Sequence, residues 1–174
     1  KIFCPDKSTE AALHRLFKER RIRKWYLVRT ENLPGLQQRY FIADTLQWKH
    51  RIRQAKTVVS LCRRTEEYCY FLALPKTGRT HQIRVHFQYI SHPLFNDPEY
   101  GGDRILKGTT FTRYKQFVQN CFNLLEGQAL HARTLGFVHP SEGKNVSFEA
   151  PLHESFQKVL DKWRTYLQGR TGEI

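Results

Sequence analysis

Three segments repeat their apolar residues with the period of an α-helix. In residues 112–125 the spacing i, i+3, i+4, i+7 lines one face with Tyr114, Phe117, Val118, Cys121, Phe122 and Leu125. A last helix, from about Glu154, turns inward Phe156, Val159, Leu160, Trp163 and Leu167. A third helix is predicted over residues 10–21, with Leu13, Leu16 and Phe17 on its inner face and Ser8 or Thr9 as its N-cap.

The middle of the chain has the pattern of β-strands. Residues 23–30 are rich in aromatic and β-branched side chains, and residues 53–64 and 67–74 are predicted to pair. Residues 128–140 form a strand pair or a strand with a bend, and residues 141–152 a hairpin that turns at Gly143. Strands in the middle and helices around them predict an α+β fold, a mixed and mainly antiparallel β-sheet with flanking helices.

Periodicity alone leaves residues 79–90 ambiguous. As a strand, the segment alternates His81, Ile83, Val85, Phe87 and Tyr89 with polar neighbours. As a helix, it places Ile83, Phe87 and Ile90 on one face. The Thr-Gly turn before it and a possible cap at Thr80 favour the helix.

Length and composition narrow the class of protein. The chain of 174 residues is long enough for one domain or two small lobes, and it has no apolar run long enough to span a membrane and no signal pattern. Four cysteines without a C-x-x-C pair indicate a reducing, cytoplasmic setting in which the thiols act as small apolar side chains. There is no methionine, not even at position 1, which indicates a piece of a longer protein.

The positive charge points to a polyanionic partner. The net charge is +13, from 29 Lys and Arg against 16 Asp and Glu, and the run Lys18 to Lys24 holds five basic residues in seven. Such a cluster is typical of nucleic-acid binding. Arg23, Lys24, Trp25 and Tyr26 place aromatic rings beside cations, which suits unstacked bases and their phosphates, although Tyr26 could equally be an ordinary core aromatic.

The sequence gives little support for a metal site, a catalytic nucleophile or a phosphate-binding loop. His81, His86 and His92 lack the spacing of common zinc sites. No cysteine or serine lies in a recognisable nucleophile motif, and the Thr-Gly turn at residues 77–80 is too short for a glycine-rich phosphate loop. That turn could still present backbone N–H groups to a phosphate, or it could be a plain turn and helix cap.

Three segments, in order, resemble the RluA family of RNA pseudouridine synthases. Residues 75–102, PKTGRTHQIRVHFQYISHPLFNDPEYGG, closely resemble that family's T-G-R-T-H-Q-I-R-V-H signature with its following H-P, D and Y-G. Residues 8–28 resemble its helix and K-x-Y strand, and residues 128–152 its L-H-A, H-P and A-P-L segment. The resemblance implies the pseudouridine synthase fold and identifies residues 1–174 as a partial catalytic domain, with its N-terminal part missing.

The departures from the family pattern concern its catalytic aspartate first. In the family the H-R-L-D motif that carries it lies just before the segment that residues 1–13 resemble, and it is absent here. Residues 13–17, LHRLF, only mimic its first letters, and an aspartate at Phe17 would not help. Ser91 and Asn96 stand where the family has glycine. Truncation upstream explains the missing motif better than its natural loss.

The resemblance implies roles for individual residues. Arg84 would hold the aspartate carboxylate ionised and oriented, and Tyr26 would stack on the extruded base and transfer a proton at carbon. Leu130 would form the pocket wall. Further contacts to RNA or to the pocket edge are expected from Lys24, Arg79, Thr80, His81 and Gln82. Asp97 and Tyr100 would shape their loop rather than react. No metal or organic cofactor is implied.

Two functions therefore remain open at the level of sequence. The first is an RNA pseudouridine synthase, a cytoplasmic monomer that isomerises uridine in ribosomal or transfer RNA. The second is a non-catalytic RNA-binding relative, such as a ribosome-assembly factor that has lost the aspartate. The two hypotheses share the fold and the RNA partner, and differ in whether a carboxylate reaches Arg84.

Overall fold

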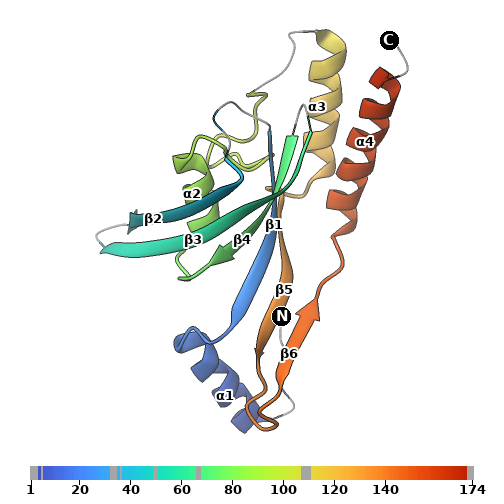
Figure 1. Cartoon of the computed structure of the whole chain (residues 1–174). Helices are drawn as coiled ribbons and strands as arrows, with labels where there is room; N and C mark the ends of the chain where they lie inside the picture. The colour runs from blue at the N-terminus through green and yellow to red at the C-terminus, as the bar shows by residue number, and fades with distance from the viewer. Residues whose placement is uncertain are drawn as a thin grey trace.

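The computed structural model describes residues 4, 6–31, 35, 37–48, 51–65, 68–106 and 111–171. The elements in chain order are α1 (Lys7–Lys18), β1 (Arg23–Glu31), β2 (Arg39–Trp48), β3 (Arg51–Arg64), β4 (Tyr68–Pro75), α2 (Gln82–Tyr89), α3 (Thr112–Leu124), β5 (Leu130–Val138), β6 (Asn145–Glu149) and α4 (Glu154–Thr171). The strands of the described part form one sheet in the order β2-β3-β4-β1-β5-β6, with antiparallel neighbours (Figure 1). The predicted α+β fold is confirmed.

The sheet has different helices on its two faces because its side chains alternate. On β4, Tyr68 and Tyr70 join the aromatic core beneath α3 and α4, whereas Cys69 and Phe71 join the core beneath α2. Helices α3 and α4 lie side by side, and α1 lies at the far end of β1, β5 and β6 (Figure 1). None of the described helices is long and apolar enough to span a membrane.

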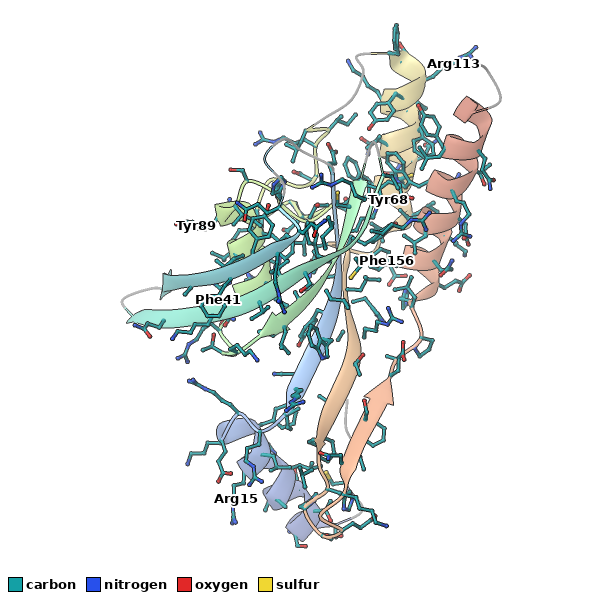
Figure 2. All side chains as sticks on the ribbon, in the orientation of Figure 1. Arg15, Phe41, Tyr68, Tyr89, Arg113 and Phe156 are labelled. Atoms are coloured by element: carbon teal, nitrogen blue, oxygen red, sulfur yellow. The ribbon has the colours of Figure 1, made fainter. Side chains whose placement is uncertain are left out.

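A buried arginine stands at the centre of the α3 and α4 side. Arg29 on β1 is fully buried, and its guanidinium carbon lies 4.1 Å from the ring centroid of Phe95, 4.7 Å from that of Trp163 and 4.8 Å from that of Tyr68. Burial lowers the pKa of Arg29, and the three ring faces offset part of that cost through cation–π attraction. In Figure 2, Tyr68 and Phe156 lie between the sheet and these helices, whereas Arg15, Phe41, Tyr89 and Arg113 point outward.

Helix starts differ from the sequence-based expectation. Asp6, not Ser8 or Thr9, is the N-cap of α1, and its Oδ1 accepts from the Thr9 N–H at 2.7 Å. Residues 79–90 do form a helix, but its N-cap is His81 in the left-handed conformation (φ 52°), so the prediction that Thr80 caps it is wrong. Leu13 and Leu16 are buried as expected, whereas Phe17 is 41% exposed.

Two features of the sheet also differ. Strand β2 had no counterpart among the expected elements. It is one of the two edge strands of the described sheet. Its outward Phe41 is 67% exposed, so the strand lacks a clear alternation of apolar and polar residues in its sequence. The hairpin predicted within residues 141–152 is instead formed by β5 and β6, and Gly143 lies in their turn with φ 67°. Residues 128–140 therefore contribute one long strand, not a pair.

The loop after α2 is held tightly against the sheet. Phe95 N donates to Arg29 O at 3.0 Å, and Ala129 N donates to Phe95 O at 2.8 Å. Ser91 and Asn96, the two replacements of family glycines, both have a positive φ, 60° and 61°. Gly102 cannot be replaced, because a Cβ there would lie 1.7 Å from Leu94 O. This packing fixes the position of Asp97.

Asn96 combines an unfavourable backbone with compensating contacts, which gives a testable pair of variants. Its Nδ2 lies 3.2 Å, 3.3 Å and 3.4 Å from the carbonyl oxygens of Gly127, Phe122 and Leu125. Both Asn96→Gly and Asn96→Ala remove these contacts, but only alanine keeps the cost of the left-handed region. We expect Asn96→Ala to lower the free energy of unfolding by about 1 kcal/mol more than Asn96→Gly, as measured by urea denaturation. Equal losses would show that the backbone conformation contributes nothing.

Candidate active site

One pocket gathers almost all of the residues predicted from the sequence. It has a volume of about 270 Å³ and lies where β1, β5 and the start of α2 meet. Seven of the eight predicted site residues line it, namely Tyr26, Arg84, Leu130, Lys24, Arg79, His81 and Gln82. Thr80 is exposed and is not among its lining residues. The size of the pocket is at the lower end for small-ligand sites.

The turn before α2 is held by Gln82. The Gln82 Oε1 accepts from Thr77 Oγ1 at 2.6 Å and from Arg79 N at 3.1 Å, and its Nε2 donates to Lys56 O at 2.9 Å and Thr57 Oγ1 at 3.0 Å. These four contacts use the full hydrogen-bonding capacity of a side-chain amide. Gln82 therefore shapes the pocket floor by bracing the turn, and its amide has no group left for a substrate.

Arg84 is held by a carboxylate from this same chain. Its Nε lies 2.8 Å from Asp97 Oδ2 and its Nη2 lies 2.6 Å from Asp97 Oδ1, a bidentate pair. Asp97 is fully buried, and the Tyr100 ring lies 4.7 Å below the guanidinium carbon. Hydrogen bonding to Asp97 raises the pKa of Arg84 above its ordinary value. The guanidinium is thus fixed in both position and charge.

Tyr26 and Leu130 form the opposite wall of the pocket. The pairing of β1 with β5 shifts by one residue between Trp25 and Tyr26, and both Tyr26 and Leu130 pack against the core beneath α2. Tyr26 is half-buried, and this burial raises the pKa of its hydroxyl above the usual value of 10.0. Its phenol is therefore neutral at pH 7 and can donate a proton as well as accept a hydrogen bond.

The sequence missed the partner of Arg84 within the chain. Asp97 lies in the loop after α2, and from the sequence we expected it only to shape that loop. Nothing in the sequence indicated its bidentate contact with Arg84. No acidic residue is among the described residues that line the pocket. Asp97 is too buried to reach a molecule bound in the pocket.

The other candidate groups, His86, His92 and the cysteines, are not among the described residues that line this pocket. The three histidines considered as metal ligands belong to no cluster of described residues that could hold a metal ion; they are His81, His86 and His92. Burial lowers the pKa of His92, with a smaller contribution from Arg64, and His86 Nδ1 lies 2.8 Å from Thr57 Oγ1. Burial raises the pKa of Cys121 to about 11, so its thiol is protonated and a poor nucleophile at neutral pH. Cys69 is also buried, whereas Cys62 is exposed, unlike the small apolar role expected for all four thiols.

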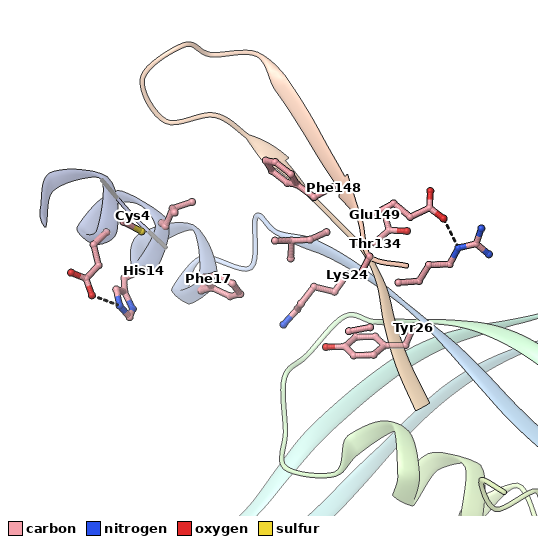
Figure 3. Close-up of a pocket in the computed structure, with 14 residues that line it drawn as sticks. Cys4, His14, Phe17, Lys24, Tyr26, Thr134, Phe148 and Glu149 are labelled. Atoms are coloured by element: carbon pink, nitrogen blue, oxygen red, sulfur yellow. Dashed lines mark hydrogen bonds and ion pairs between the residues drawn. The ribbon is translucent and has the colours of Figure 1, made fainter. Parts of the chain in front are cut away.

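A larger groove adjoins the pocket through Lys24 and Tyr26, which line both. It has a volume of about 760 Å³ and lies between α1 and the strands β1, β5 and β6 (Figure 3). Figure 3 shows Phe17 of α1 and Phe148 of β6 on either side of it, and Lys24 Nζ lies 5.4 Å from the Phe17 ring centroid. The groove went undetected in the sequence because Phe17 shares the apolar spacing of the inner helix face.

The comparisons with known proteins agree with this geometry. The family model for RNA pseudouridylate synthase matches residues 2–89, half of the chain. An uncharacterised RNA pseudouridine synthase of Chlorobaculum parvum is 45% identical over 91 residues, which cover 52% of this chain and 28% of the relative. Ribosomal large subunit pseudouridine synthase D of Neisseria meningitidis is 41% identical over 112 residues, covering 64% of this chain and 28% of the relative.

Similar folds occur among solved structures. The human protein RNA pseudouridylate synthase domain containing 4 superposes with a TM-score of 0.72 at 19% identity, covering 91% of this chain and 69% of that one. The human protein RNA pseudouridylate synthase domain containing 1 gives a TM-score of 0.64 at 20% identity, covering 94% and 73%.

These matches differ in extent and in what they establish. The chain spans about a third of the length of the curated relatives that it matches. The two solved structures establish the likeness of fold, and the family model, which extends through the whole T-G-R-T-H-Q-I-R segment, establishes descent. The resemblance seen in the sequence is confirmed, and the chain belongs to the RNA pseudouridylate synthase family.

Proposed function

We propose that this chain provides the base-binding half of an RNA pseudouridine synthase, which isomerises uridine to pseudouridine. The observation that carries the proposal is the single pocket of about 270 Å³ in which β1, β5 and α2 bring together Tyr26, Leu130 and Arg84. These residues come from three separate family motifs. A structural role alone would not require them to share one cavity.

The pocket suits one nucleoside rather than a run of stacked bases. A base inside an RNA structure must leave its stack to enter, which costs a few kcal/mol. Lys24 and Arg79 line the pocket and can offset that cost by contacting flanking phosphates. The adjoining groove of about 760 Å³, with its exposed Phe17 and Phe148 rings, offers room and stacking faces for the neighbouring nucleotides.

Each wall of the pocket has its own role in the proposed reaction. The Tyr26 ring stacks on the extruded uracil, and its neutral hydroxyl exchanges a proton as the base is rejoined through carbon. Arg84 orients and keeps ionised the attacking carboxylate, which comes from the H-R-L-D motif of the family and not from this sequence. Asp97 holds Arg84 in place for that encounter.

The class of RNA and the setting are further parts of the proposal. Ribosomal RNA is favoured over transfer RNA by the name of the Neisseria meningitidis relative, ribosomal large subunit pseudouridine synthase D. We place the protein in the cytoplasm, where ribosomal RNA is modified, and expect it to act as a monomer. The non-catalytic alternative has the same pocket but needs no carboxylate beside Arg84.

Tritium release separates catalysis from binding alone. The full-length gene product should release tritium from RNA that carries [5-³H]uridine, because rejoining the base at that carbon expels its hydrogen. Residues 1–174 alone should bind single-stranded RNA but release none, since none of the described residues that line the pocket is acidic. RNA binding without tritium release by the full-length protein would favour the non-catalytic relative.

Replacement of Arg84 tests its proposed contact with the carboxylate, provided that the fold survives. Arg84→Ala alone leaves the fully buried Asp97 without its cation, which should destabilise the protein by about 3–5 kcal/mol. The double variant Arg84→Gln with Asp97→Asn removes both charges and should fold. We expect it to lower kcat of the full-length protein at least about 10²-fold with RNA affinity changed less than about fivefold. A loss of affinity as large as the loss of kcat would show that Arg84 serves only to bind RNA.

The hydroxyl of Tyr26 can be tested apart from its ring. Tyr26→Phe retains the stacking face and should leave KM nearly unchanged while it lowers kcat by about 10²–10⁴-fold, the usual contribution of a general acid or base. Tyr26→Leu should raise KM as well, because it also removes the ring. Steady-state tritium release on one RNA measures both variants. Full activity in Tyr26→Phe would assign proton transfer to another group.

A further inference from the structure

A second carboxylate, that of Glu99, also contacts Arg84, and unlike that of Asp97 it is exposed to solvent. Glu99 Oε2 lies 3.1 Å from Arg84 Nη2, and Glu99 Oε1 lies 3.4 Å from His81 Nδ1. The Glu99 side chain is 48% exposed, whereas that of Asp97 is 0% exposed. The half-exposed Glu99 carboxylate regains water when it leaves, so its release costs less than the release of the fully buried Asp97 would.

The groups that hold the Glu99 carboxylate have the character of an anion site. Arg84 offers a guanidinium that is already oriented by Asp97, and His81 offers a ring nitrogen 3.0 Å from the Tyr100 hydroxyl. Both Arg84 and His81 also line the 270 Å³ pocket, together with the cations of Lys24 and Arg79. Arginine pairs equally well with carboxylate and phosphate oxygens, since its planar donors match both.

The place of Glu99 indicates which anion belongs there. Glu99 is not among the described residues that line the pocket, so its carboxylate contacts Arg84 and His81 from outside the cavity. A carboxylate that attacks the nucleotide must reach the interior. The backbone phosphate of an extruded nucleotide stays outside, because only the base and sugar enter.

We propose that Glu99 occupies a phosphate subsite of the RNA backbone, formed by Arg84, His81 and Tyr100, and that an incoming phosphate displaces its carboxylate. The inference rests on the proposed function, because it takes RNA as the ligand of the adjoining pocket. Glu99 then acts as an internal competitor, which keeps the Arg84 edge covered until a strand with a suitably placed phosphate arrives. Asp97 remains bound to Arg84 throughout.

Removal of the competitor should strengthen RNA binding. We expect Glu99→Gln to raise the affinity of the chain for a short labelled oligouridylate by roughly twofold to fivefold, the range of a lost exposed ion pair. The slope of log K against log salt should stay the same in both proteins, because the proposed phosphate contact forms in both and only its competitor is removed. Fluorescence anisotropy across a salt series measures both quantities, and inorganic phosphate should compete at lower concentration in the variant.

Glu142→Gln is the matched control. Glu142 is similarly exposed, at 57%, and pairs with His139 at the turn between β5 and β6, so its replacement makes the same change of net charge away from Arg84. An equal gain of RNA affinity in both variants would show that the effect comes from net charge alone. Weaker RNA binding by Glu99→Gln would show that Glu99 itself contacts the RNA. Either result would overturn the proposed phosphate subsite. Absence of RNA binding by the unmodified chain would instead overturn the proposed function itself.

Discussion

The contact between Arg84 and Asp97 is the constraint on which the pocket depends. It joins the first turn of α2 to the loop that follows that helix, and it is bidentate and almost completely buried. A buried charge is tolerated only with a partner, so neither residue can move without the other. The guanidinium is therefore held in one position and orientation by Asp97.

The two faces of the sheet differ in what they pack against: one carries the aromatic core, and the other carries α2 and the pocket. On one face, α3 and α4 pack over Arg29 and the aromatic rings around it. That packing secures Phe95, whose backbone is bonded to β1 and to Ala129, and so it fixes the loop that carries Asp97. On the other face, α2 packs through Ile83 and Phe87 and leaves Arg84 at the pocket. The packing on the first face therefore also fixes Asp97 and, through it, the position of Arg84 on the second face.

Sequence patterns predicted the parts of the molecule in which one face is consistently apolar. The helices over residues 112–125 and from Glu154 are present because burial of that face outweighs local preferences. Thr80 does not cap α2 as expected, because the N-cap is His81 in a left-handed conformation. That conformation depends on the turn that the Gln82 side chain holds in place. Phe17 has helical apolar spacing yet lies in a groove, because α1 meets only the end of the sheet.

By itself, the sequence determined the family, the α+β class and seven of the residues that line the pocket, because motifs and periodicity are local properties of the chain. Only the tertiary structure decided which of these side chains are free to act. Gln82 is fully used within its turn, and Arg84 is already paired with Asp97 and Glu99. The physical reason is that hydrogen bonds and ion pairs depend on distances across the fold, which local sequence does not set. Tyr26, Arg84 and Leu130 are far apart in sequence and come to line one pocket only when the sheet forms.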